Sequence, residues 1–373
     1  MSKRVLITGG AGFVGSHLVD GLLKAGHQVR ILDHFSPQVH PAGAPDYLSP
    51  EVEVVVADIR HLSGLKKALA DIDVIFHFAA SVGVGQSMYE ISRYMSVNTQ
   101  GTAELLQAML DSRAPIEKLI VASSMSIYGE GRYTCPTCHQ PAAPPVRSIA
   151  QLRAGKWNLE CGKCGDTLQP QPTEETKPSE INSFYALSKR DQEEMCLIYG
   201  RTYDLPVTAL RFFNIYGTRQ SLSNPYTGVA AIFASRLLNH QAPLVFEDGE
   251  QMRDFVSVHD IVHANILAME RPESNGEVIN IGSGEPITIR QVAEMLARSL
   301  NSTIEPVITR KFRAGDIRHC FADLSKAHAL LGYKPQITHQ DGFKELAEWL
   351  SQQRADDKAE MMLKELTAYG LTA

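Results

Sequence analysis

The sequence predicts an α/β fold: a doubly wound parallel sheet with a smaller C-terminal α/β lobe and a cysteine-bearing insertion. Three observations predict it. In the first third of the chain, short apolar runs alternate with segments of helical periodicity. Glycines at positions 9, 12 and 15 follow the first apolar run, at the spacing of a strand-to-helix turn. Residues 131–172 interrupt the alternation and carry two Cys-x-x-Cys pairs.

The predicted elements follow one another at short intervals. Short apolar runs bounded by turn residues are assigned as strands, and longer periodic segments are assigned as helices. The strands span residues 5–8, 29–33, 52–57, 73–78 and 118–122, and the helices span residues 12–24 and 97–112. The alternation resumes near Ser183, and the chain after about Asn224 mixes helices with short strands.

The composition excludes several classes of protein. The chain has 373 residues, of which 44% are hydrophobic, and its formal net charge is −6. No long basic run is present, so nucleic acid is not expected as a partner. No segment approaches the ~18 apolar residues of a membrane helix and no secretory signal follows Met1, so we expect a cytoplasmic protein. Cysteines in that reducing compartment are expected to be metal ligands or core thiols.

The glycine-rich turn after the first strand predicts a dinucleotide site. Glycine permits the tight turn there, lets a pyrophosphate approach backbone N–H groups at the helix N-terminus, and allows close packing of helix on strand. A carboxylate at the end of the second strand, Asp33, is placed to bond the adenosine ribose and would repel a 2′-phosphate, which favours NAD over NADP. Asp58 and Ile59 follow the third strand, near the expected adenine. The other cofactor residues predicted at this turn are Gly9, Gly12, Phe13, Val14 and Gly15.

Tyr185 and Lys189 are the predicted catalytic pair. They lie four residues apart, so on a helix they would occupy one face, one turn apart. A nearby ammonium group favours the phenolate, and we therefore expect Lys189 to lower the pKa of Tyr185.

Together with these features, two further segments carry a family resemblance. Residues 123–129 (Ser-Ser-Met-Ser-Ile-Tyr-Gly) and 211–217 (Arg-Phe-Phe-Asn-Ile-Tyr-Gly) resemble segments of the extended short-chain dehydrogenase/reductase family. More narrowly, the chain is similar to the NAD-dependent nucleotide-sugar epimerase/dehydratase branch. The resemblance runs from Lys3 to about Leu350, apart from the insertion, and implies a Rossmann-type fold with tightly bound NAD.

The resemblance also implies roles for individual residues. Tyr185 would act as general base and acid, Lys189 would support it and bind the nicotinamide ribose, and Ser124 would bond the reacting hydroxyl. The residues implied to bind the nucleotide-diphosphate sugar are Ser124, Ser126, Asn214, Arg253 and Asp316. The residues implied to line NAD include Ala79, Ala80, Ser81, Asn98, Ser123, Tyr185 and Lys189.

The residues after Ser124 limit the reaction. Dehydratases of the branch carry an Asp-Glu pair there, and sugar-acid decarboxylases typically carry a Glu, whereas this chain has Met125 and Ser126. The remaining reading is a nucleotide-sugar 4-epimerase that oxidises C4, rotates the 4-keto sugar and reduces its other face. Through the cysteine-bearing insertion, the resemblance implies dTDP-L-rhamnose, giving dTDP-6-deoxy-L-talose, as the first expected substrate, and UDP-glucose/UDP-galactose is the alternative. C2 epimerisation and net dehydrogenation remain open.

The insertion carries four cysteines in two pairs separated by 22 residues. Two such pairs suit tetrahedral zinc, as in a zinc ribbon, and four thiolate ligands would make the metal structural. Two disulfides, an iron site or a degenerate remnant are the alternatives. The predicted ligands are Cys135, Cys138, Cys161 and Cys164.

The predicted organisation has four parts. Residues 1–130 and 173–223 form the NAD-binding domain, with a return segment near 255–275. Residues 131–172 form the zinc-ribbon-like module, 224–350 mainly the substrate-binding lobe, and 351–373 a C-terminal helical tail. The family resemblance favours a homodimer built from helices near 100–112 and 185–200. A different class of function, a non-catalytic NAD-binding regulator or scaffold with a zinc interaction module, is the competing interpretation.

Overall fold

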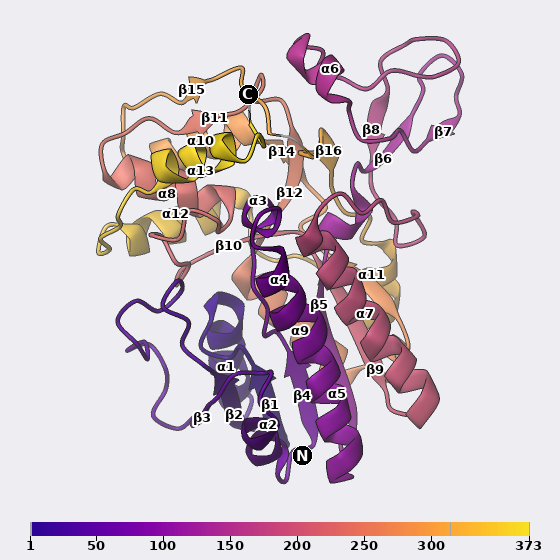
Figure 1. Cartoon of the computed structure of the whole chain (residues 1–373), viewed down its shortest axis with the longest axis vertical. Helices are drawn as coiled ribbons and strands as arrows, with labels where there is room; N and C mark the ends of the chain where they lie inside the picture. Colours follow the sequence, from indigo (N-terminus) through magenta and orange to yellow (C-terminus); the bar gives the residue numbers. More distant parts are fainter. Residues whose placement is uncertain (1, 314, 373) are drawn as a thin grey trace.

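The computed structural model describes residues 2–313 and 315–372 (Figure 1). Its largest element is a seven-stranded parallel sheet with the order β3–β2–β1–β4–β5–β9–β13. The strand order reverses between β1 and β4, and ligands of such sheets bind beyond the carboxyl ends of the strands at this point. The strands are β1 (Arg4–Thr8), β2 (Gln28–Asp33), β3 (Glu53–Val56), β4 (Val74–His77), β5 (Lys118–Ser124), β9 (Val207–Phe212) and β13 (Val278–Ile281).

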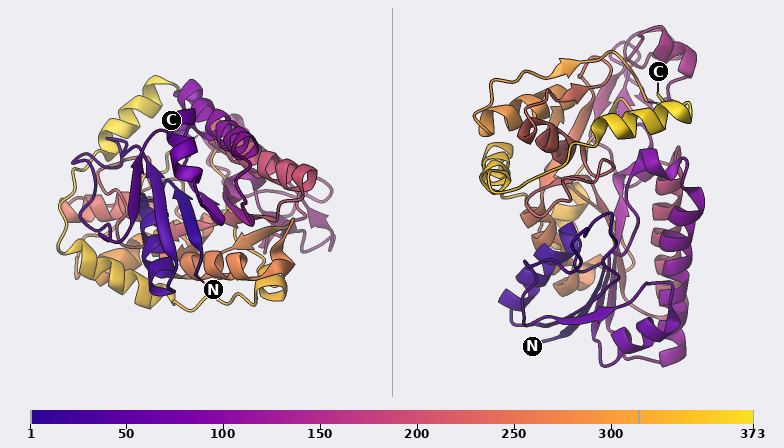
Figure 2. Two further views of the ribbon diagram at one scale, coloured as in Figure 1. Left: turned by 90° about the horizontal axis from the view of Figure 1, so that it is seen from below. Right: turned by 60° about the vertical axis from the view of Figure 1, so that its left-hand side comes forward.

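Helices cover both faces of this sheet, as the views in Figure 2 show. Each face has its own apolar core, because every central strand is buried on both sides. One core is closed by α1 (Phe13–Lys24), α9 (Val258–Glu270) and α11 (Ser325–Leu331), and the other by α2 (Leu62–Leu69), α5 (Gly101–Ser112) and α7 (Phe184–Tyr203). The predicted Rossmann-type α/β sheet is confirmed, and the first five strands lie within two residues of their predicted bounds.

The return to the large sheet extends beyond the predicted segment near 255–275. Residues 252–257 form β12 of a second sheet, α9 packs on α1, and β13 then adds the seventh strand at the edge. The polar residue Asn280 interrupts the apolar run of β13, so the sequence pattern does not identify this strand. Its side chain is fully buried and is satisfied by the carbonyl of Thr173 and the hydroxyl of Tyr128.

A second unit lies beside the carboxyl ends of the large sheet (Figure 2). Its sheet has the order β10–β12–β14, with β16 also paired to β12, and a small β11–β15 pair lies apart from it. Three helices close a third apolar core. The elements are β10 (Asn214–Tyr216), α8 (Val229–Leu238), β11 (Leu244–Val245), β12 (Met252–Ser257), β14 (Pro286–Thr288), α10 (Ile289–Ser299), β15 (Val307–Ile308), β16 (His319–Cys320), α12 (His339–Leu350) and the C-terminal α13 (Ala359–Ala368).

The inserted segment projects from the end of the large sheet (Figure 1). It forms a three-stranded antiparallel sheet, β7–β6–β8, and one short helix. A small core of Tyr133, Cys135, Leu159 and Leu168 holds it together. Its elements are β6 (Arg132–Thr134), β7 (Pro141–Ala142), α6 (Ile149–Arg153) and β8 (Gln169–Gln171).

Short helical turns complete the chain: α3 (Val84–Ser87), α4 (Ile91–Tyr94), the π-helical turn η1 (Met95–Gln100), and the 3₁₀ turns η2 (Met125–Tyr128) and η3 (Pro272–Ser274). The helix predicted over 97–112 therefore begins as the π turn η1 and continues as α5. Among the helices in the described part of the chain, none has the length and hydrophobicity needed to cross a bilayer.

Candidate active site

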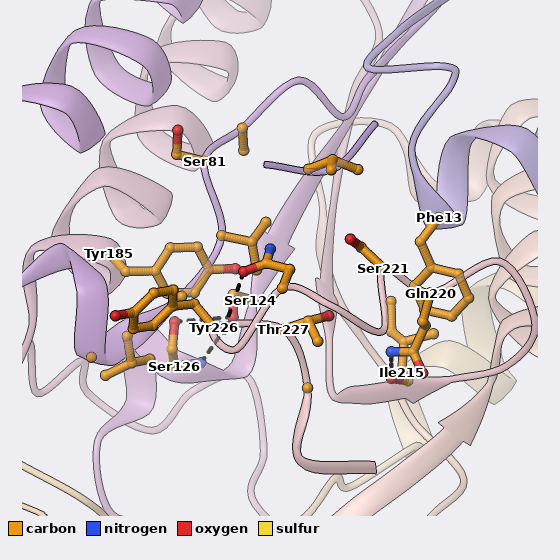
Figure 3. Close-up of a pocket in the computed structure, with 18 of the residues that line it drawn as sticks. Phe13, Ser81, Ser124, Ser126, Tyr185, Ile215, Gln220, Ser221, Tyr226 and Thr227 are labelled. Carbon is orange, nitrogen blue, oxygen red and sulfur yellow. Dashed lines mark hydrogen bonds between the residues drawn. The ribbon is translucent and has the colours of Figure 1, made fainter. Parts of the chain in front are cut away.

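A pocket of about 910 Å³ lies between the large sheet and the second unit. Figure 3 shows Tyr185, Ser124, Ser126 and Tyr226 gathered at one side of the view, and Phe13, Ile215, Gln220 and Ser221 at the other. Most of the residues predicted to bind cofactor or substrate line this pocket, although they come from distant segments of the chain.

The glycine-rich turn forms one wall of the pocket. Gly9 has a φ of 71°, and a Cβ there would lie 2.9 Å from the backbone nitrogen of Ala79. At Gly15 a Cβ would overlap the carbonyl oxygen of Gly9. Gly12 caps α1 without any side-chain hydrogen bond, so no side chain competes for the first N–H groups of the helix. Phe13 and Val14 line the pocket beside them. This turn fits a pyrophosphate at the N-terminus of α1.

Two carboxylates at the ends of β2 and β3 lie on the same side of the pocket. Asp33 is almost fully buried, and its two oxygens accept hydrogen bonds from the backbone N–H groups of Ala11 (3.1 Å) and Phe35 (2.9 Å). Asp58 forms an ion pair with Arg60 at 2.6 Å, and that contact lowers the pKa of Asp58 to about 2. Ile59 lines the pocket next to them.

The residues directly after β4 line the pocket, but one other residue predicted for the cofactor site lies behind the pocket wall. Ala79, Ala80 and Ser81 line the pocket, whereas Asn98 is fully buried within the π turn η1. The Asn98 side chain exchanges two hydrogen bonds with the backbone of Ser81, at 2.7 and 3.0 Å, and donates another to Ser188 Oγ of α7 at 2.9 Å. Asn98 therefore holds the pocket wall and α7 together.

The first turn of α7 brings Tyr185 to the pocket. Ser183 caps this helix, since its hydroxyl accepts a hydrogen bond from the N–H of Ala186 at 3.1 Å. Tyr185 and Lys189 both line the pocket, and Ser124 reaches it from the end of β5. The Ser124 hydroxyl accepts hydrogen bonds from Ser126 N (3.2 Å) and Ser126 Oγ (3.0 Å), and its own proton is directed to the Tyr185 phenol.

The sequence predicts a lowered pKa for Tyr185, but in the structure the pKa of Tyr185 is raised. Burial raises the pKa of Tyr185, and the Ser124 hydroxyl only partly opposes the rise. Lys189 does not oppose it either, because its ammonium donates to Gln192 Oε1 at 2.8 Å and burial lowers its own pKa to about 8. The sequence pattern fixes only the shared helix face, whereas the pKa depends on desolvation that the pattern does not contain.

Ser123 lines the pocket at the end of β5, but its hydroxyl is already used. It donates to Glu193 Oε2 at 2.6 Å, and Glu193 also accepts from Arg211. Asn214 lies at the pocket as well, and its Oδ1 is a buried oxygen without a hydrogen-bond partner. Two more such oxygens line the pocket, on Gln220 and Gln251. Buried unpaired acceptors of this kind fit a polar ligand.

The predicted pair Arg253 and Asp316 lies together at the pocket, at 3.2 Å. Arg313, which the sequence reasoning did not single out, also pairs with Asp316, at 3.0 Å. Although burial opposes it, these arginines lower the pKa of Asp316. A carboxylate between two guanidinium groups holds them in place, and the two arginines are the groups suited to a diphosphate.

Sequence reasoning predicted a helical tail over residues 351–373 but did not predict that this tail lines the pocket. Met362 and Leu366 of α13 line the pocket and form a small core with Tyr226. Glu365 of α13 accepts hydrogen bonds from the hydroxyls of Tyr226 and Tyr89. The apolar positions of α13 are its only signal in the sequence, and that signal does not identify what the helix covers.

The four predicted metal ligands come together in the insertion. All four sulfur atoms lie within 4.8 Å of one another, and the structure leaves the cysteines unbridged. In each Cys-x-x-Cys pair the residue that follows has a positive φ, at His139 (51°) and Gly165 (79°). The N–H of each of these residues donates to the carbonyl of the first cysteine of its pair. The two pairs thus form similar turns, and four converging thiols fit a tetrahedral metal.

Comparison with known proteins identifies the family. Residues 5–149 match the profile of the NAD dependent epimerase/dehydratase family, and residues 165–346 match that of GDP-mannose 4,6 dehydratase. A dTDP-L-rhamnose 4-epimerase of Burkholderia thailandensis is 34% identical over 94% of this chain and 96% of its own length. The chain belongs to the NAD dependent epimerase/dehydratase family. The predicted family and the predicted enzyme class, NAD-dependent nucleotide-sugar epimerases, are confirmed.

Two other proteins show the breadth of the similarity. A putative UDP-glucose 4-epimerase of Methanocaldococcus jannaschii is 30% identical over 93% of this chain and 98% of its own length. The solved UDP-glucuronic acid 4-epimerase of Bacillus cereus, in complex with UDP-glucuronic acid and NAD, superposes with a TM-score of 0.77. It is 27% identical and covers 94% of this chain and 99% of its own. The family relation therefore leaves the sugar open.

Proposed function

We propose that this epimerase inverts C4 of a nucleotide-diphosphate 6-deoxyhexose, with dTDP-L-rhamnose as the first candidate. The observation that carries the proposal is the pocket side beside Tyr185. The Tyr94 ring packs edge-on against the Tyr185 ring, with 6.4 Å between the ring centroids. The Tyr94 hydroxyl donates to the carbonyl of Val82 at 3.0 Å. The side chains of Val82 and Val84 are 54% and 43% exposed and line the pocket. An apolar wall here suits a methyl group at C6.

The charges around the pocket favour an uncharged sugar. Every arginine that lines it is ion-paired with a carboxylate, as Arg93 is with Glu90 at 2.6 Å and Arg236 with Asp357 at 3.0 Å. Arg253 and Arg313 are assigned to the diphosphate, so a uronate carboxylate would depend on arginines that other carboxylates already neutralise. UDP-glucose/UDP-galactose, whose hexose is also uncharged, is the second candidate because relatives named for that activity are 30% and 32% identical to this chain.

Three residues would carry the proton at the sugar. Ser124 donates to the C4 oxygen, and the Tyr185 phenolate removes the C4 hydroxyl proton and returns it after the sugar turns over. Lys189 would approach the nicotinamide ribose, whereas the Ser124 hydroxyl is the group that lowers the pKa of Tyr185 against the effect of burial. NAD, when bound, accepts the C4 hydride and gives it back. Met125 and Ser126 supply no carboxylate, so elimination of water or loss of carbon dioxide has no acid or base at that position.

A donor panel tests this proposal. The protein is incubated with dTDP-L-rhamnose, UDP-glucose, UDP-N-acetylglucosamine and UDP-glucuronate, and the products are separated by chromatography coupled to mass spectrometry. We expect a new peak of unchanged mass from dTDP-L-rhamnose, and sugar analysis should identify 6-deoxytalose. A product from UDP-glucose alone would favour the second candidate. Loss of water or carbon dioxide would contradict epimerisation, and no product from any donor would contradict the proposal as a whole.

Asp33 should determine the choice between NAD and NADP. We predict that Asp33→Ser lowers the preference for NAD roughly tenfold or more, because a charged hydrogen bond to the ribose is lost together with the repulsion of a 2′-phosphate. The measurement is the affinity for each dinucleotide, along with the dinucleotide released on denaturation. The exposed neighbour Asp46 provides a control, since Asp46→Asn should leave the preference unchanged. Recovery of NADP alone from the unaltered protein would contradict the role of Asp33.

The insertion is proposed to bind one structural zinc ion through its four cysteines. Elemental analysis of the purified protein should find about one zinc per chain, and Cys161→Ser should abolish it because three thiolates no longer complete the site. Cys196 lies in the main apolar core, far from the insertion in the fold, so Cys196→Ala should retain the metal. Two disulfides in place of the metal would appear as a loss of four mass units and would sink this assignment.

The homodimer is a further proposal. Leu110 of α5 and Leu187 and Ile198 of α7 are exposed large apolar side chains, and α5 and α7 are packed neighbours on one face of the molecule. Ile198, at 52% exposure, would be covered by a second copy. Sedimentation of the purified protein at several concentrations tests this. A cytoplasmic location, where free thiols persist, likewise remains a prediction.

A further inference from the structure

The insertion reaches the pocket through one buried arginine. Arg147 lies between β7 and α6, and its side chain has no exposed surface. Its guanidinium donates to Glu247 Oε2 at 2.8 Å, to the carbonyl of Trp157 at 3.1 Å and to the carbonyl of Asp316 at 3.1 Å. It thus links the insertion to two separate parts of the second unit. Asp316 is the residue whose carboxylate holds Arg253 and Arg313 at the pocket.

A second arginine, which belongs to the second unit, contacts the insertion in return. Arg318, in the segment just after Asp316, donates to both oxygens of Asp248 (2.6 and 2.9 Å) and to the side chain of Asn158 in the insertion (3.1 Å). Leu152 and Trp157 of the insertion pack on Phe312 in a small separate core. Phe312 and Arg318 therefore contact the insertion, whereas Arg313 and residues 315–317 line the pocket.

The buried charges around Arg147 explain why the contact between the insertion and the second unit is specific. Glu130, at the start of the insertion, lies 3.6 Å from Arg147, and both side chains are fully buried. The Glu130 carboxylate also accepts the N–H groups of Arg318 (2.7 Å) and His319 (3.3 Å). A buried guanidinium that satisfies three acceptors in fixed directions defines their positions more sharply than apolar packing does.

We infer that Arg147 is a positioning residue through which the insertion sets the place of the diphosphate-binding arginines, and thereby the affinity for the nucleotide sugar. The inference rests on the proposed function, since it takes Arg253 and Arg313 as the diphosphate ligands. It assigns the insertion a role in substrate binding and none in NAD binding, because the NAD side of the pocket lies on the large sheet.

The test compares Arg147→Lys with an arginine variant that breaks no contact. Lysine keeps the charge beside Glu247 but cannot also bond both carbonyls, so the link to Asp316 is lost. Arg153 is exposed on α6 of the same insertion, and Arg153→Met is the control. Binding of dTDP and UDP is measured by calorimetry, NAD content by absorbance after denaturation, and KM and kcat with the donor that reacts.

We expect Arg147→Lys to raise the Kd of the nucleoside diphosphate and the KM roughly tenfold, with kcat within twofold and full NAD content. Arg153→Met should match the unaltered protein. Unchanged Kd and KM would overturn the inference, and so would a parallel loss of NAD, kcat and affinity, which a merely structural role predicts. If Arg147→Lys does not fold, Arg147→Met/Glu247→Gln removes both charges, and the same readouts apply. Failure of the unaltered protein to bind either diphosphate would instead refute the proposed function.

Discussion

Replacing Tyr185 by phenylalanine is expected to lower turnover by about 10²–10⁴-fold, the range for loss of a general acid–base group. The phenol oxygen is the only atom removed, and it lies at the pocket beside Ser124. Without it no group at this position takes the C4 hydroxyl proton. Fold and NAD binding should persist, because Gly12 and Asp33, the residues predicted to contact the pyrophosphate and the ribose, lie on other elements.

The measurement is kcat with the reacting donor, alongside NAD content and thermal unfolding. Tyr203→Phe is the matched control, since Tyr203 lies on the same helix, α7, with half of its surface exposed. It should retain the activity of the unaltered protein. Normal turnover by Tyr185→Phe would refute the assigned chemistry, whereas equal loss of NAD and of thermal stability would indicate a structural role for the phenol.

The cofactor side of the pocket was predictable because its determinants are local. Gly9, Gly12 and Gly15 belong to one strand-to-helix turn, and Asp33 ends the adjacent strand. A parallel sheet brings the carboxyl ends of β1, β2 and β4 to one edge, so the positions follow once the strands are recognised. The role of Ser124 came instead from the family resemblance, and the structure has Ser124 at the end of β5 and Tyr185 on α7.

The substrate side was less predictable because it is assembled from distant segments. Arg253 is far in the sequence from the Arg313–Asp316 pair that it contacts, and Tyr226 is far from Leu366 of α13, so no local pattern connects them. The contact of the insertion with residues 315–318 depends on charged side chains that are buried together, although each resembles a surface residue in the sequence. The raised pKa of Tyr185 was unpredictable for the same reason, because the desolvation that raises it is a property of the assembled pocket.

The second large effect is expected at Arg211, which joins β9 to the catalytic helix α7. Its guanidinium forms a two-pronged pair with Glu193 of α7 at 2.6 and 2.9 Å, and both side chains are buried. It also donates to the Tyr128 hydroxyl at 2.8 Å. Replacing Arg211 by methionine leaves Glu193 as an unpaired buried charge, and we expect a loss of about 3–5 kcal/mol in the free energy of unfolding.

Thermal and urea unfolding measure this loss, and the exposed pair on the same helix provides the comparison. Arg190 and Glu194 also form an ion pair on α7, at 2.6 Å, but both are about one third exposed. Arg190→Met should therefore cost less than about 1 kcal/mol. If Arg211→Met also lowered the free energy of unfolding by less than about 1 kcal/mol, that result would contradict the importance of the buried pair.

A double variant separates the pair itself from the charge left behind. Arg211→Met/Glu193→Leu contains neither charge, so much of the lost stability should return if the unpaired Glu193 is the main cost. Turnover should not return equally, because the Glu193 carboxylate also accepts the Ser123 hydroxyl at 2.6 Å and so ties α7 to the end of β5. Tyr185 and Ser124 lie on those two elements. Recovery of stability with a persistently low kcat would therefore locate the function of this pair in the alignment of the catalytic groups.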